Sequence, residues 1–107
     1  MKEASSERDG KIHRINLLKM DNAVLAFCFE GNLKIGTLAI STPGLRDGAV
    51  GTSSVLLGGK YLIAARALAE RAAAIFGKMS LISLNTTLAE GEALRVYSGL
   101  LDKVTSP

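Results

Sequence analysis

Residues 50–85, which decide the fold, read VGTSSVLLGGKYLIAARALAERAAAIFGKMSLISLN. A run of β-branched and apolar residues stops at Gly58-Gly59, and an alanine-rich segment follows, which favours helix because Ala has the highest helix propensity. Gly77 stands where a helix end needs a residue in the left-handed conformation. The stretch therefore predicts a strand, a helix and a second strand, at residues 50–57, 60–76 and 79–84.

Three further strands are expected before this stretch, at residues 11–20, 24–29 and 33–41. The first two are separated by Asp21-Asn22, and the last two by Gly31-Asn32. Asn and Gly suit tight turns, so the pattern predicts an antiparallel meander. The polar residues 1–9 show no periodicity and are expected to form a flexible tail. Residues 10–107 are expected to form a single domain, with a loop at residues 42–49.

A second helix is expected at the C-terminal end. Thr87 and Glu90 have the spacing of a capping box. Apolar residues then recur at helical spacing, at positions Ala89, Ala93, Val96, Tyr97, Leu100, Leu101 and Val104. The whole pattern predicts an α+β fold, with a mainly antiparallel sheet of five to six strands flanked by two helices, in the order β-β-β-β-α-β-α.

Composition limits the possible functions. The 107 residues suit one domain, and 48% of them are hydrophobic, which is more than a small domain can hide. Part of this apolar surface is expected in a dimer interface. The net charge of +3 is spread over scattered basic residues with only 5% aromatics. Nucleic-acid binding, which needs a clustered basic patch, is not expected.

The compartment is expected to be the cytoplasm. Cys28 is the only cysteine, which excludes an internal disulfide and any multi-cysteine metal site. It lies in an apolar run, where a thiol packs as a small hydrophobe. No apolar run reaches the roughly 18 residues of a membrane span. The polar N-terminus does not resemble a signal peptide.

No residue pattern predicts catalysis, a metal or a cofactor. A hydrolase using His13 with Thr52, Ser53 or Ser54 is a formal alternative, but no nucleophile-elbow context surrounds these hydroxyls. The Gly58-Gly59-Lys60 turn fails the phosphate-loop pattern, because Ser54 replaces the first Gly and Tyr61 replaces Ser or Thr.

Some of these residues also carry a family resemblance. The run Thr52-Ser53-Ser54-Val55-Leu56-Leu57-Gly58 and the helix pattern Ala65-x-x-Leu68-Ala69-x-Arg71 resemble the small proteasome assembly chaperones of types 4 and 3. The resemblance spans residues 11–104 and includes Lys34-x-Gly36-Thr37-Leu38 and Leu84-Asn85. Its motif residues are Thr52, Ser53, Leu57, Gly58, Leu68, Ala69 and Arg71.

The resemblance implies a non-enzymatic chaperone that acts as a homodimer, or as a heterodimer with a related small chaperone. It implies that the partners are α-subunits of the proteasome core particle, bound during α-ring formation. The sequence ends Val104-Thr105-Ser106-Pro107 and does not carry the hydrophobic-Tyr-X ending by which other assembly factors dock. Contact through a surface is therefore expected. A small dimeric adaptor of roadblock or profilin type is the alternative.

Overall fold

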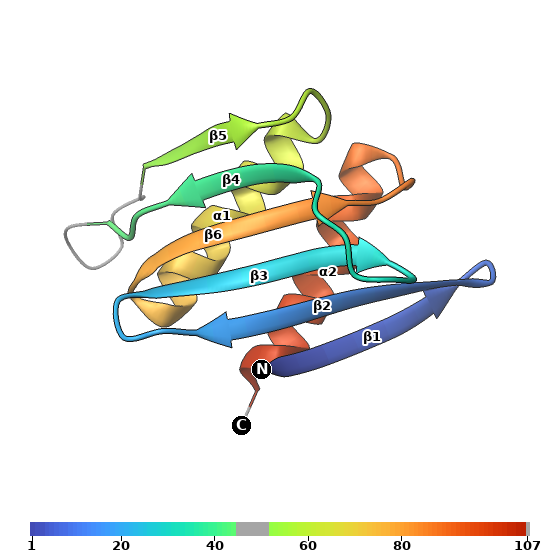
Figure 1. Ribbon diagram of the computed structural model, residues 1–107, viewed down its shortest axis with the longest axis horizontal. Coiled ribbons are helices and arrows are strands. Elements are labelled where there is room, and N and C mark those ends of the chain that lie inside the picture. Colours follow the sequence, from blue (N-terminus) through green and yellow to red (C-terminus); the bar gives the residue numbers. More distant parts are fainter. Residues whose placement is uncertain (45–51, 107) are drawn as a thin grey trace.

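The computed structural model describes residues 1–44 and 52–106, which form a six-stranded sheet with two helices (Figure 1). The elements in chain order are β1 (Lys2–Arg8), β2 (Lys11–Lys19), β3 (Ala23–Glu30), β4 (Thr37–Ser41), β5 (Ser53–Leu57), α1 (Leu62–Phe76), β6 (Met79–Asn85) and α2 (Glu90–Thr105). The predicted α+β class is confirmed. Most of the predicted loop at 42–49, and the first two residues of the strand predicted at 50–57, lie outside the described residues.

The order of strands in the sheet is β1-β2-β3-β6-β4-β5. β3 pairs with β6 in parallel, and the other neighbours are antiparallel. The predicted meander is therefore wrong in its third strand, because β4 pairs with β6 and β5 and not with β3. The physical reason is the length of the connection. Residues 31–36 lie outside the strands, and this segment is long enough to carry the chain past β6.

The predicted flexible tail is also wrong, because residues 2–8 form β1. This strand pairs with β2 along its whole length, from Lys2 opposite Leu17 to Arg8 opposite Lys11. The turn between them has positive φ at both Asp9 (52°) and Gly10 (79°), as a two-residue hairpin loop requires. β1 is an edge strand, and charged residues are common on edges because they discourage pairing with other molecules. Because of that composition, β1 has no apolar run by which a strand could be predicted.

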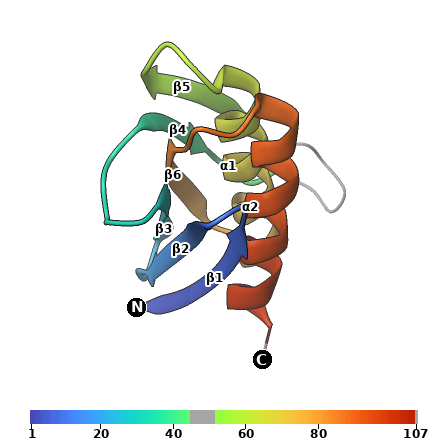
Figure 2. The same cartoon turned by 90° about the vertical axis from the view of Figure 1, so that its right-hand side faces the viewer.

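Both helices cover the same face of the sheet, and on the opposite face only the connection from β3 to β4 crosses one end (Figure 2). α1 packs closely because its buried positions are mostly alanine, and the Ser80 hydroxyl of β6 donates to the carbonyl of Ala69 at 2.5 Å. Gly77 ends the helix with φ of 64°, as predicted. On α2, the buried residues are the predicted stripe without its first member: Ala93, Val96, Tyr97, Leu100, Leu101 and Val104.

The turn from β5 into α1 depends on Gly58. Its φ is +118°, and a Cβ built on it would lie 2.6 Å from the Thr37 hydroxyl oxygen and 2.9 Å from the Thr37 Cα. The Thr37 hydroxyl in turn donates to the carbonyl of Lys60 at 2.6 Å. Gly59, the next residue, has open space around its Cβ position. The two glycines of the pair therefore carry different constraints.

We expect Gly58→Ala to lower the free energy of unfolding by about 2 kcal/mol or more, because it adds both backbone strain and a clash with Thr37. Urea unfolding followed by circular dichroism measures this. Gly59→Ala is the matched control and should change stability by less than about 0.5 kcal/mol. Equal effects of the two substitutions would contradict this account of the turn.

Candidate functional site

The motif residues of the sequence do not converge on one site. Thr52 is exposed, and its carbonyl accepts from the backbone N–H of Thr42 at 2.9 Å. The Ser53 hydroxyl donates to the Glu70 carboxylate and accepts from Arg66 at 3.1 Å. These contacts fasten β5 to α1. Leu57 is exposed at the end of β5.

The remaining motif residues hold the helices in place. Leu68 and Ala69 are buried in the core. Arg71 of α1 makes a bidentate pair with Asp102 of α2, with its Nη2 at 2.7 and 3.0 Å from the two carboxylate oxygens. Both side chains are about half exposed, so solvent screens the pair and it contributes little to stability. The motif is thus structural in these positions.

The hydrolase alternative is contradicted by the topology. His13 lies on β2, whereas Ser53 lies on β5, and β3, β6 and β4 separate these strands. Four strand spacings amount to about 19 Å, which is far outside hydrogen-bond reach. Cys28 is fully buried, and desolvation raises the pKa of its thiol to about 12. The thiol is therefore protonated and packs as a hydrophobe, as predicted.

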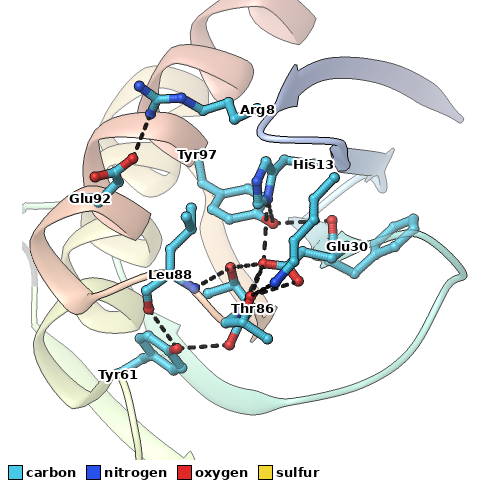
Figure 3. Close-up of polar contacts among 11 residues, drawn as sticks. Arg8, His13, Glu30, Tyr61, Thr86, Leu88, Glu92 and Tyr97 are labelled. Carbon is cyan, nitrogen blue, oxygen red and sulfur yellow. Dashed lines mark hydrogen bonds and ion pairs between the residues drawn. The ribbon is translucent and has the colours of Figure 1, made fainter.

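The described residues contain a partly buried polar cluster, formed by His13, Glu30, Tyr61, Thr86, Thr87 and Tyr97 (Figure 3). Glu30, at the end of β3, is its centre. Its carboxylate accepts from the Thr86 hydroxyl at 2.6 Å and from the Thr87 backbone N–H at 2.8 Å. The Thr87 hydroxyl donates to it as well and accepts from the Lys11 ammonium at 2.7 Å. The cluster joins the end of β3 to the segment that leads into α2.

His13 occupies a defined tautomer in this cluster. The Tyr97 hydroxyl donates its one proton to the carbonyl of Phe29 at 3.1 Å. Its oxygen must then accept from His13 Nδ1, which lies 3.0 Å away. His13 Nδ1 therefore carries a proton, and Nε2 has no partner among the described residues. The rings of His13 and Tyr97 meet edge to face, with centroids 5.7 Å apart.

The environment of Glu30 favours its ionised form. Desolvation by itself would raise the pKa of this carboxyl group. Hydrogen bonds from Thr86 and Thr87 outweigh it, and with the nearby His13 they lower the pKa below the ordinary value of 4.5. Glu30 is thus an anion that the surrounding hydroxyl and N–H groups stabilise. These contacts give it a structural role.

Tyr61 closes the cluster on the side of α1. It has left-handed backbone geometry (φ 59°), which is uncommon for a bulky residue. Its hydroxyl lies 2.7 Å from the carbonyls of both Thr86 and Leu88, which share its one proton. Desolvation, together with the charges of Glu30 and Glu90, raises the pKa of Tyr61 and keeps this donor protonated. These bonds hold the strained residue in place.

Glu90 caps a helix, but not its own. Its carboxylate accepts from the backbone N–H groups of Ile63 and Ala64, at 2.7 and 2.8 Å, in the first turn of α1. The capping box predicted from Thr87 and Glu90 is therefore wrong: Ala89 is the N-cap of α2 and makes no side-chain bond. Because a carboxylate already occupies the N-terminus of α1, no phosphate-loop function fits the Gly58-Gly59-Lys60 turn.

Two apolar surfaces remain exposed. On the open face of the sheet, Leu18, Leu25, Leu81 and Ile40 lie opposite one another on β2, β3, β6 and β4. We call these four residues the open-face row. A second group, which we call the corner surface, flanks the turn between β5 and α1. Its members and their exposed fractions are Leu56 (58%), Leu57 (65%), Leu62 (45%) and Ile63 (71%).

In the described part of the chain, no three His, Cys, Asp or Glu side chains gather as metal ligands. Neither described helix is long and apolar enough to cross a membrane. The N-terminal helix that would favour a roadblock-like or profilin-like adaptor is not seen, because residues 2–8 form β1.

The fold also occurs in a protein of known structure. No family model matches the sequence, and no curated protein does so either. A solved structure described as a novel chaperone complex for yeast 20S proteasome assembly matches the fold with a TM-score of 0.69. The two sequences are 13% identical, and the match covers 98% of each chain. The chain thus shares its fold with a chain of that complex along nearly its whole length.

We expect the stability contributed by Glu30 to depend on pH. Its pKa is lower in the folded state than in the unfolded state, so ionised Glu30 stabilises the fold above pH 4.5, and this stabilisation is lost as the pH falls through the folded-state pKa. Glu30→Gln should therefore destabilise the protein at neutral pH. The difference from the unmodified protein should shrink on acidification to about pH 3. Urea unfolding across this range measures it.

Glu92→Gln is the control for this prediction. Glu92 pairs with Arg8 at 3.0 Å and with Arg95 at 3.4 Å on the surface. Such exposed pairs contribute little, so this variant should stay within about 1 kcal/mol of the unmodified protein at neutral pH. A stability difference for Glu30→Gln that stays constant with pH would contradict the structural role assigned to the charge.

Proposed function

We propose that this protein is a non-enzymatic assembly chaperone that acts in the cytoplasm, binds α-subunits of the proteasome core particle during α-ring formation, and works as a dimer. The observation that carries the proposal is the fold match to a chaperone complex for yeast 20S proteasome assembly, at a TM-score of 0.69 over 98% of both chains. The sequence resemblance at Thr52–Gly58 and Ala65–Arg71 points to the same family.

The mechanism would be surface burial without turnover or cofactor. A stable contact of this kind buries roughly 800 Å² on each partner. The chain has the exposed apolar residues for it in two places, the open-face row and the corner surface. Its sole histidine has its Nδ1 bonded to Tyr97 inside the polar cluster, and its sole thiol is buried in the core.

The open face supports the dimer. An antiparallel sheet with one face in water carries polar residues at the outward positions. Here one outward position on each of four neighbouring strands is apolar instead: Leu18, Leu25, Leu81 and Ile40. Leu25, Leu81 and Ile40 are only partly exposed in the single chain, and Leu18 is 37% exposed. Two sheets packed through such faces would form a sandwich with the helices outside. We propose that the dimer is formed in this way.

The function is tested by affinity capture. Tagged protein in native cytosol should enrich proteasome α-subunits, identified by mass spectrometry, over a tagged protein of similar size and charge. Free α-subunits and early α-ring intermediates should be enriched more than the complete core particle, because an assembly chaperone leaves before completion. Capture of no α-subunit would overturn the proposal.

The dimer is tested by sedimentation. The unmodified protein should sediment with twice the monomer mass, and Leu81→Glu should sediment as a folded monomer, because it places a charge in the middle of the open-face row. Ile75→Glu is the control. Ile75 is 43% exposed on α1, on the helix side of the molecule, so its dimer should persist. A dimer that survives Leu81→Glu, or an unmodified chain that is a monomer at all concentrations, would contradict the open-face dimer.

A further inference from the structure

The corner surface is the most concentrated exposed apolar group in the described chain. Four large apolar side chains lie within eight consecutive residues, from Leu56 to Ile63, and each is at least 45% exposed. Both ends of this segment lie at the periphery of the fold. β5 is the last strand of the sheet, and Leu62 and Ile63 are in the first turn of α1. Exposed apolar side chains grouped in this way are typical of interaction sites.

A hollow lies beside two of these side chains, Leu62 and Ile63. It has a volume of about 500 Å³ and lies between the start of α1 and the segment leading into α2. Leu62, Ile63 and Leu88 give it apolar walls, and Tyr61 and Glu90 belong to its lining. Tyr61 is fixed by its bonds to Thr86 and Leu88, and Glu90 is fixed by its bonds to the N-terminus of α1. The hollow is therefore preformed, which lowers the entropic cost of filling it.

The charge of the lining indicates the chemistry of the occupant. Glu90 is compensated by two backbone N–H groups and by the helix dipole. Lys60 is exposed at the rim, and no ion pair among the described residues involves it. The one uncompensated charge of the hollow is thus positive. An apolar side chain with a neighbouring carboxylate complements it.

A second copy of the chain fits this surface poorly. A two-fold contact centred on Lys60 would bring Lys60 of one copy towards Lys60 of the other, and like charges in an interface oppose binding. The open-face row carries no charge at its four positions and suits self-association better. The two apolar surfaces are therefore suited to different partners.

We infer that the corner surface is where the α-subunit docks, by inserting an apolar side chain into the hollow and placing an acidic residue against Lys60. The inference rests on the proposed function and adds the contact surface and the chemistry of the contact. Each dimer paired through its open faces would present two corner surfaces, one on each subunit.

The test uses the full chain and individually purified proteasome α-subunits as probes, with affinity measured by biolayer interferometry. Ile63→Ser and Lys60→Glu should each weaken binding of the recognised α-subunit about tenfold or more. Both residues are exposed, so the melting temperature and the dimer mass should not change. Binding by the unmodified chain should weaken with added salt, and Lys60→Glu should reduce this dependence.

Two matched controls keep the result specific. Ile75→Ser changes an exposed isoleucine at the other end of α1, and Lys103→Glu reverses an exposed lysine near the end of α2. Both should bind α-subunits within about twofold of the unmodified chain. Losses as large as those of the corner variants would overturn the assignment of the surface.

The remaining outcomes are distinct. If the unmodified chain binds an α-subunit and the corner variants bind it equally well, the surface is wrong and the proposed function stands. If the unmodified chain binds none of the α-subunits, both fail. If Ile63→Ser dissociates the dimer, the corner is a self-contact and the assigned partner is wrong. If Ile63→Ser weakens binding and Lys60→Glu does not, the inferred acidic residue on the partner is wrong.

Discussion

The parallel pairing of β3 with β6 is the constraint on which the rest of the structure depends. It joins the N-terminal strands to the half of the chain that holds both helices, and it runs from Ala23 opposite Met79 to Phe29 opposite Asn85. Because the two strands run in the same direction, they end at the same edge of the sheet. Glu30 thereby lies next to Thr86 and Thr87, whose hydroxyl and N–H groups donate hydrogen bonds to its carboxylate and stabilise the ionised form. The polar cluster is thus a consequence of strand direction, and it fixes where α2 begins.

The same arrangement decides which surfaces stay exposed. Two helices cover one face of six strands, and the alanines of α1 bring that helix close to β4 and β6. The helices leave the open-face row uncovered, and residues 31–36 cross one end of that face, where Gly36 and Ile35 bond to Ser83 and Asn85. A chain of 107 residues with 48% hydrophobic content cannot bury all of its apolar side chains in a two-layer core. Some of the apolar side chains that stay exposed therefore lie in the open-face row and in the corner surface.

The elements with local periodic signals could be predicted from the sequence, whereas pairing could not. α1, α2 and β6 follow from helical spacing, from the run at residues 79–84 and from Gly77, all of which act within a few residues. β1 is not predicted, because its charged residues show no alternation of apolar and polar positions, although Asp9-Gly10 is a hairpin signal. The insertion of β6 between β3 and β4 depends on contacts fifty residues apart along the chain. The bonds of Glu90 to α1 and the left-handed Tyr61 have no local pattern, and so the corner hollow could not be predicted either.

The separation of the two exposed surfaces has a functional logic of its own. An uncharged apolar row suits a two-fold contact, because none of its four side chains opposes a second copy by its charge. A surface with an uncompensated lysine at its rim discriminates against its own copy and in favour of an acidic partner. A small domain that carries both can associate with itself permanently while it holds another protein transiently, since the charged contact weakens with ionic strength and the apolar one does not. Release of the second partner then requires no change in the fold, only competition for the corner surface.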